Sequence, residues 1–72
     1  MFNQVKYYMK NAAVAWQDSF GREIILDKSN LIQAMKNIAK NRTEYKTDQA
    51  FQRQLKIYDD ARKFAGWELS EP

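Results

Sequence analysis

Apolar side chains recur at helical spacing over two long stretches of this 72-residue chain. In the first stretch, residues 28–41, the apolar positions are Leu31, Ile32, Met35, Ile38 and Ala39. Spacings of three, four and seven residues place these side chains on one face of a helix. Asp27 stands just before the stretch, where its carboxylate can accept hydrogen bonds from the free N–H groups of the first turn. The pattern predicts a helix over residues 28–41.

The second stretch, residues 47–65, has the same periodicity, with apolar positions at Phe51, Leu55, Tyr58, Ala61 and Ala65. Thr47 can cap its start, and Gly66 can adopt the left-handed conformation that commonly ends a helix. Only a short link separates the two stretches, and short links favour antiparallel neighbours. We therefore expect a second helix that packs against the first. The expected core residues of the pair are Leu31, Met35, Ile38, Phe51, Leu55 and Tyr58.

The first third of the chain fits two structures. A helical stripe is formed by Phe2, Val5, Met9, Ala12, Ala13 and Trp16. A hairpin fits as well, with strands at 13–17 and 22–26, because Ile24 and Ile25 favour strands and Gly21 can take a positive φ in the loop. In both structures residues 22–26 are extended.

We expect a single domain over residues 1–72 that is mostly α-helical, with three helices and a short extended segment near 22–26. The alternative is an α+β fold, in which a β-hairpin at 13–26 packs on helices 28–41 and 47–65.

Composition limits the class of protein. Hydrophobic residues make up 44% of the chain, which is more than disordered segments carry. The longest apolar run, Ala12 to Trp16, is too short to cross a bilayer. The first ten residues lack the apolar block of a secretory signal peptide. These features predict a cytoplasmic protein with no membrane partner.

The chain is also poor in catalytic chemistry, because it contains no cysteine and no histidine. It therefore lacks the thiolate nucleophile, the commonest general base and the best zinc ligands. The only adjacent carboxylates, Asp59 and Asp60, fall on a predicted helix, where neighbouring side chains do not face each other. No spacing resembles a calcium, phosphate or dinucleotide motif. We expect no enzyme activity, no metal and no cofactor.

The net charge of +3 is unevenly distributed. Residues 28–56 carry seven basic side chains against two acidic ones, and Asn and Gln side chains lie among them. Lys and Arg bind phosphates, and Asn and Gln can bind adenine edges. The candidate basic patch consists of Lys36, Lys40, Arg42, Lys46, Arg53 and Lys56. No DNA-binding signature accompanies it, so an ordinary solvated surface rich in Lys and Asn is the favoured interpretation of the pattern.

Ten aromatic residues are more than so small a core can enclose. We expect Trp16, Phe51, Tyr58 and Phe64 inside. Tyr7, Tyr45 and Trp67 are expected near the surface, as partner-binding aromatics, because Tyr and Trp are frequent at interfaces. The sequence thus predicts a small non-enzymatic binding protein, a regulator, inhibitor or adaptor, that contacts a protein partner or a second copy of itself. The alternative is a nucleic-acid-binding protein that uses the basic patch at 28–56.

Overall fold

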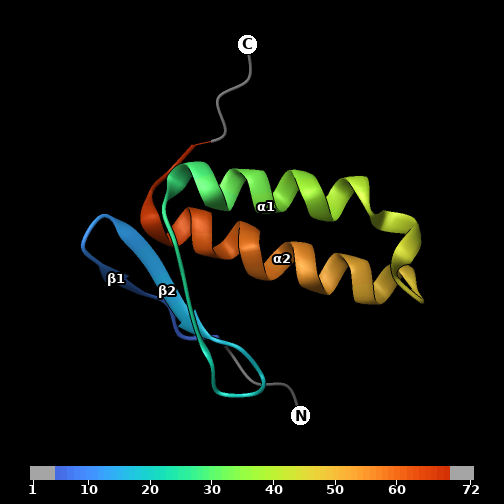
Figure 1. Cartoon of the computed structure of the whole chain (residues 1–72), viewed down its shortest axis with the longest axis horizontal. Helices are drawn as coiled ribbons and strands as arrows, with labels where there is room; N and C mark the ends of the chain where they lie inside the picture. Colours follow the sequence, from blue (N-terminus) through green and yellow to red (C-terminus); the bar gives the residue numbers. More distant parts are fainter. Residues whose placement is uncertain (1–4, 69–72) are drawn as a thin grey trace.

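The computed structural model describes residues 5–68 (Figure 1). The elements are β1 (Tyr8–Lys10), β2 (Ala13–Gln17), β3 (Glu23–Leu26), α1 (Lys28–Lys40), the 3₁₀ helix η1 (Arg42–Glu44) and α2 (Asp48–Ala65). The strands form an antiparallel sheet in the order β1-β2-β3. The helices α1 and α2, joined through η1, form a helical hairpin, and the sheet packs near the end of this hairpin where α1 begins and α2 ends. The fold is α+β.

The expected three-helix domain is therefore wrong, because the first third of the chain contains strands. β1 and β2 are joined by only two residues, Asn11 and Ala12, since Lys10 pairs with Ala13. Asn11 has a φ of 57°, a left-handed conformation that Asn tolerates better than most residues. This turn reverses the chain in the middle of the stripe that suggested a helix.

Residues 13–26 form the hairpin of the α+β alternative. Trp16 lies opposite Ile24, and Ala15 lies opposite Ile25. The strand β1, which adds a third strand to this hairpin, was not part of either expected structure. Its three residues are too few for periodicity to distinguish them from a helical stripe.

The two helices start and end close to the residues that the sequence indicated. The Asp27 carboxylate accepts a hydrogen bond from the Asn30 N–H at 2.8 Å, and the Thr47 hydroxyl accepts one from the Ala50 N–H at 3.0 Å. Gly66 ends α2 with a φ of 80°. All three capping interactions are local, which explains why the sequence alone located them.

The core lies between β2 and the helices and is centred on Trp16, whose exposed fraction is 2%. Val14, Leu31 and Ala61 are buried with it. Ile38 is also buried, whereas Met35, Phe51, Leu55 and Tyr58 are half-buried. The sheet covers only one end of the helical hairpin. Tyr58 packs against Trp16 of the sheet but, like the other three side chains, is less enclosed than expected.

Phe64 was expected inside and is instead 52% exposed. It lies at the margin of the core, with its ring centroid 5.9 Å from that of Tyr7.

We expect Leu31→Ala to lower the free energy of unfolding by about 2–5 kcal/mol, because Leu31 is fully buried and the truncation leaves a cavity. Leu55→Ala should cost about 1–2 kcal/mol, since a half-buried side chain loses less transfer energy. Lys36→Ala, on the exposed side of α1, is the control and should be nearly neutral. Urea unfolding followed by circular dichroism measures all three. Equal losses for Leu31→Ala and Leu55→Ala would contradict the position of the core.

Candidate functional site

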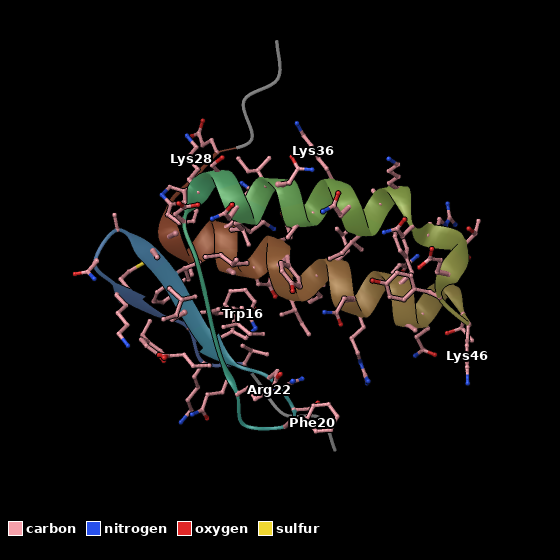
Figure 2. All side chains as sticks on the ribbon, in the orientation of Figure 1. Trp16, Phe20, Arg22, Lys28, Lys36 and Lys46 are labelled. Atoms are coloured by element: carbon pink, nitrogen blue, oxygen red, sulfur yellow. The ribbon has the colours of Figure 1, made fainter. Side chains whose placement is uncertain are left out.

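The six residues of the candidate basic patch all lie in the half of the helical hairpin that includes η1, but they do not share one face. Figure 2 shows Lys36 on the edge of α1 that points away from α2, whereas Lys46 lies on the opposite side of the molecule, in the connection to α2. Lys40 is one turn after Lys36 and lies on the same edge. The structure therefore gathers the cations into one region, residues 36–56, but spreads them around it.

Two of the six cations are neutralised within the chain. An Nη of Arg42 lies 3.2 Å from an Asp48 carboxylate oxygen, and the Lys56 Nζ lies 3.2 Å from one of Asp60. The remaining four, Lys36, Lys40, Lys46 and Arg53, are exposed. None of these four lies within ion-pair distance of a carboxylate in residues 5–68.

The three aromatics predicted to bind a partner are all half-buried and engaged in packing. Tyr45 lies edge-on against Phe51, with ring centroids 5.8 Å apart, and the Arg42 guanidinium lies 5.3 Å from the same Phe51 ring. Trp67 packs against the core, and its carbonyl accepts a hydrogen bond from Arg62 at 2.8 Å. A partner-binding role for these rings would have to use the area that packing leaves exposed.

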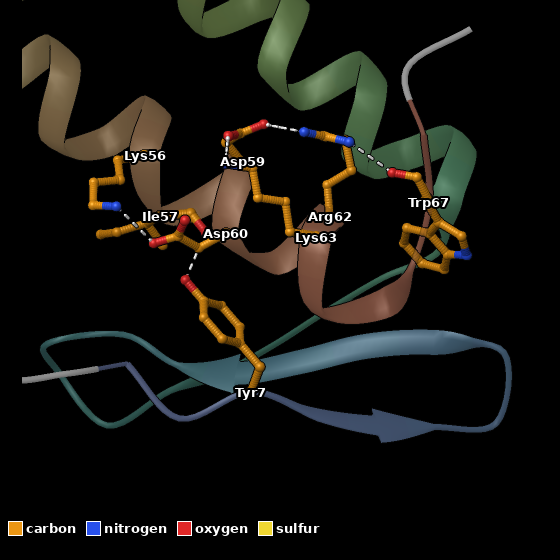
Figure 3. A network of polar contacts seen from close by, with 8 residues as sticks. All are labelled: Tyr7, Lys56, Ile57, Asp59, Asp60, Arg62, Lys63 and Trp67. Atoms are coloured by element: carbon orange, nitrogen blue, oxygen red, sulfur yellow. Dashed lines mark hydrogen bonds and ion pairs between the residues drawn. The ribbon is translucent and has the colours of Figure 1, made fainter.

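Tyr7 connects the sheet to α2 (Figure 3). Its hydroxyl donates a hydrogen bond to the Ile57 carbonyl at 2.7 Å, and its ring packs edge-on against Trp16 at 5.5 Å. Burial, together with the nearby Asp60 carboxylate, raises the pKa of Tyr7 to about 12. The side chain thus holds β1 and β2 against the C-terminal half of α2.

Asp59 and Asp60, the only adjacent carboxylates, point into separate ion pairs. Two guanidinium nitrogens of Arg62 donate to one Asp59 oxygen at 2.8 and 3.0 Å, and Lys63 lies 3.4 Å from the other. These contacts, the Arg62 hydrogen bond above all, lower the pKa of Asp59. Asp60 pairs with Lys56 instead (Figure 3). The two carboxylates therefore contact different cations rather than each other.

Phe20, which sequence reasoning did not select, is the most exposed large apolar side chain of the described residues, at 81%. It lies in the loop between β2 and β3, residues 18–22, which we call the Phe20 loop (Figure 2). The Arg22 guanidinium carbon lies 5.3 Å from the centroid of the Phe20 ring. The sequence held one signal for this residue: an aromatic in a tight Asp-Ser-Phe-Gly turn has little room to reach the core.

The Phe20 loop is held by one carboxylate. Asp18 Oδ1 accepts hydrogen bonds from the N–H groups of Phe20 and Arg22, both at 2.9 Å, and Oδ2 accepts from Arg22 Nε at 3.2 Å. The Gly21 N–H donates to the Asp18 carbonyl, and Gly21 adopts a φ of 82°. The hydrogen bond from the Arg22 N–H is the main cause of the lowered pKa of Asp18. Phe20 is therefore exposed on a loop whose backbone is ordered by hydrogen bonds.

Besides the basic patch and the Phe20 loop, the outer face of the sheet, which turns away from the helices, is also exposed. The small side chain of Ala15 lies at its centre and is fully buried between Tyr8 and Ile25, its partners on the two flanking strands. Tyr8 donates a hydrogen bond to Glu23, and Lys10 lies 3.5 Å from the same carboxylate. Tyr8, Lys10 and Glu23 are thus paired with one another on this face.

Within residues 5–68, no three carboxylates gather closely enough to hold a metal ion. No helix in the same part of the chain is both long and apolar enough to cross a membrane. The exposed groups of residues 5–68 include the Phe20 ring and the four patch cations that have no ion-pair partner, and both can take part in binding.

The raised pKa of Tyr7 predicts that the protein loses stability at alkaline pH. The folded state favours the protonated phenol. The stabilisation that protonated Tyr7 contributes is therefore complete below about pH 10, and it is lost as the pH rises through about 12. Tyr7→Phe should lower the free energy of unfolding at pH 7 by about 0.5–1.5 kcal/mol, because the hydrogen bond to Ile57 is lost. The variant should then lose less stability than the parent between about pH 9 and 12.

Urea unfolding at each pH measures this difference. Tyr45→Phe is the control, since none of residues 5–68 forms a hydrogen bond with the Tyr45 hydroxyl. Parallel alkaline losses in the parent and in Tyr7→Phe would show that Tyr7 does not ionise against the fold.

Comparison with protein-family models, with curated proteins and with solved structures found no match to this chain. The surface of the described residues presents an exposed aromatic side chain on an ordered loop and a set of unpaired cations.

Proposed function

We propose that this chain is a cytoplasmic, non-enzymatic binding protein that acts as a regulator, inhibitor or adaptor through contact with another protein. The observation that carries the proposal is the exposure of Phe20 on a hydrogen-bonded loop. An isolated exposed leucine or alanine needs no explanation, but a phenylalanine ring that is 81% exposed leaves a large apolar area in water. Burial of that apolar area against a partner would be favourable, because it would remove the ring from water.

The order of the loop supports a binding role. Binding through a mobile loop loses free energy to the ordering of that loop, and a preformed loop avoids most of this cost. The Asp18 carboxylate holds the backbone on both sides of the ring through two hydrogen bonds of 2.9 Å. Phe20 can therefore be inserted into a partner with little further loss of entropy.

Arg22 extends the proposed contact. Its side chain is 74% exposed, and its Nε is engaged by Asp18. A guanidinium has four further N–H donors, on its two Nη atoms, and these can bind acceptors on a partner. Phenylalanine and arginine are both enriched at the centres of protein interfaces, so Phe20 and Arg22 together favour a protein partner.

Phe20→Ala should remove partner binding and leave the fold intact. Immobilised parent, Phe20→Ala and Phe64→Ala are compared for the proteins that they retain from a nuclease-treated lysate. Phe64→Ala is the matched control, because Phe64, on α2, is the other exposed phenylalanine among residues 5–68. A partner of the Phe20 loop should be retained by the parent and by Phe64→Ala. The partner should bind Phe20→Ala more weakly than it binds the parent, by about 2 kcal/mol or more, as at interface hot spots.

Thermal unfolding checks the fold of each variant, and Phe20→Ala should change stability by at most about 0.5 kcal/mol, as exposed substitutions do. Sedimentation of the parent over a range of concentrations tests whether the partner is a second copy of the chain. Retention of the same proteins by the parent and Phe20→Ala would reject the proposal.

A further inference from the structure

The net positive charge of the molecule lies apart from its exposed apolar side chains. Residues 36–56, which we call the basic tip, contain six cations and two carboxylates, for a net charge of +4. The other described residues contain six cations and six carboxylates, for a net charge of zero. The large apolar side chains that are exposed lie outside the basic tip; they are Tyr8, Met9, Phe20, Ile25 and Phe64. The basic tip is thus an electrostatic surface without an apolar anchor.

The unpaired cations of the basic tip follow its perimeter. The molecule is thin, with a shortest extent of 17 Å, and Lys36 and Lys46 lie on opposite edges of it (Figure 2). Arg53 is two residues from both Phe51 and Leu55, so it lies on the side of α2 away from α1. Cations therefore lie on both edges of the pair of helices, where their long side chains can contact phosphates.

The aromatic rings of the basic tip are not available for stacking on bases. Tyr45 packs against Phe51, and Arg42 covers the Phe51 ring while it pairs with Asp48. Proteins that bind single strands rely on exposed aromatic rings for that stacking. The shallow hollow beside Arg53, of about 250 Å³, is lined by Thr47, Gln49 and Ala50 and offers no ring either. The basic tip therefore suits phosphates better than bases.

From this arrangement we propose that the basic tip binds the phosphate backbone of double-stranded DNA without sequence preference. Lys36, Lys40, Lys46 and Arg53 supply the contacts, and each neutralised phosphate releases counterions. This inference is independent of the function proposed for the Phe20 loop. A duplex is the expected ligand because it carries about one charge per 1.7 Å of its axis, a higher density than a single strand.

The test is fluorescence anisotropy of a labelled 20-base-pair duplex of arbitrary sequence, titrated with the full chain. Four phosphate contacts predict that the affinity falls about a hundredfold between 50 and 200 mM salt. The tip variant, Lys46→Glu with Arg53→Glu, is compared at 100 mM salt with a control, Lys6→Glu with Lys28→Glu. Both variants change the net charge from +3 to −1, and all four positions are exposed.

The tip variant should bind the duplex at least about tenfold more weakly than the control, because it removes two phosphate contacts. Phe20→Ala should bind like the parent, since it removes no charge. Both double variants should keep the parent's circular dichroism spectrum, because the substituted side chains do not belong to the core.

Four results would overturn the proposal. These are no binding of the duplex at 50 mM salt, equal losses in the tip variant and the control, tighter binding of a single strand than of the duplex, and loss of duplex binding in Phe20→Ala. The last two would indicate base stacking rather than phosphate contact.

Discussion

The packing of Trp16 against the C-terminal half of α2 is the contact on which the rest of this structure depends. Its ring lies 5.4 Å from Tyr58 of α2 at an interplanar angle of 87°, and Tyr7 closes the other side at 5.5 Å. One buried tryptophan removes about 150–250 Å² from water, a large share for a domain in which few side chains are fully buried. Because Trp16 lies on the central strand, it fixes the whole sheet, and the Tyr7 hydrogen bond to Ile57 adds a second attachment to α2.

This attachment also determines what the surface can do. Trp16 is four residues from Phe20, and the pairing of Gln17 with Glu23 closes the hairpin directly beside the Phe20 loop. The position of the loop is therefore fixed by the core on one side and by Asp18 on the other. Because the sheet covers only one end of the helical hairpin, the basic tip extends beyond it. Because the small core encloses few side chains, the Phe20 ring and the unpaired cations of the basic tip remain exposed.

The sequence predicted the parts of the fold that local interactions determine. The caps at Asp27, Thr47 and Gly66 lie within a few residues of the groups that they satisfy, so both helices were located correctly. The first third of the chain depends instead on pairing between strands and on a core contact with α2, more than 40 residues away. Apolar spacing alone did not distinguish a helix from strands there, and the left-handed turn at Asn11 was not foreseen.

The prediction of the candidate sites from the sequence was limited in the same way as the prediction of the fold. Composition showed where the positive charge lies along the chain, and the Lys56–Asp60 pair follows from i,i+4 spacing on a helix. The pairing of Arg42 with Asp48 depends on the geometry of the connection, and the sequence did not indicate it. Tyr7 was expected at the surface, but its hydroxyl binds a carbonyl 50 residues away. Side-chain direction in a loop also depends on the folded structure, so Phe20 was missed.

The two proposed surfaces differ in how they respond to salt, and that difference ranks them. Contacts between exposed charges weaken as ions screen them, with a screening length of about 8 Å at physiological ionic strength. Sequence-independent DNA binding is then weak, with dissociation constants of about 10⁻⁴ to 10⁻⁶ M. Burial of an apolar ring is not screened, because it depends on the area removed from water rather than on charge. At physiological salt, the contact proposed for the Phe20 loop would therefore keep its binding free energy, while the contact proposed for the basic tip would lose most of its own. This difference ranks the proposal of protein binding above the proposal of DNA contact.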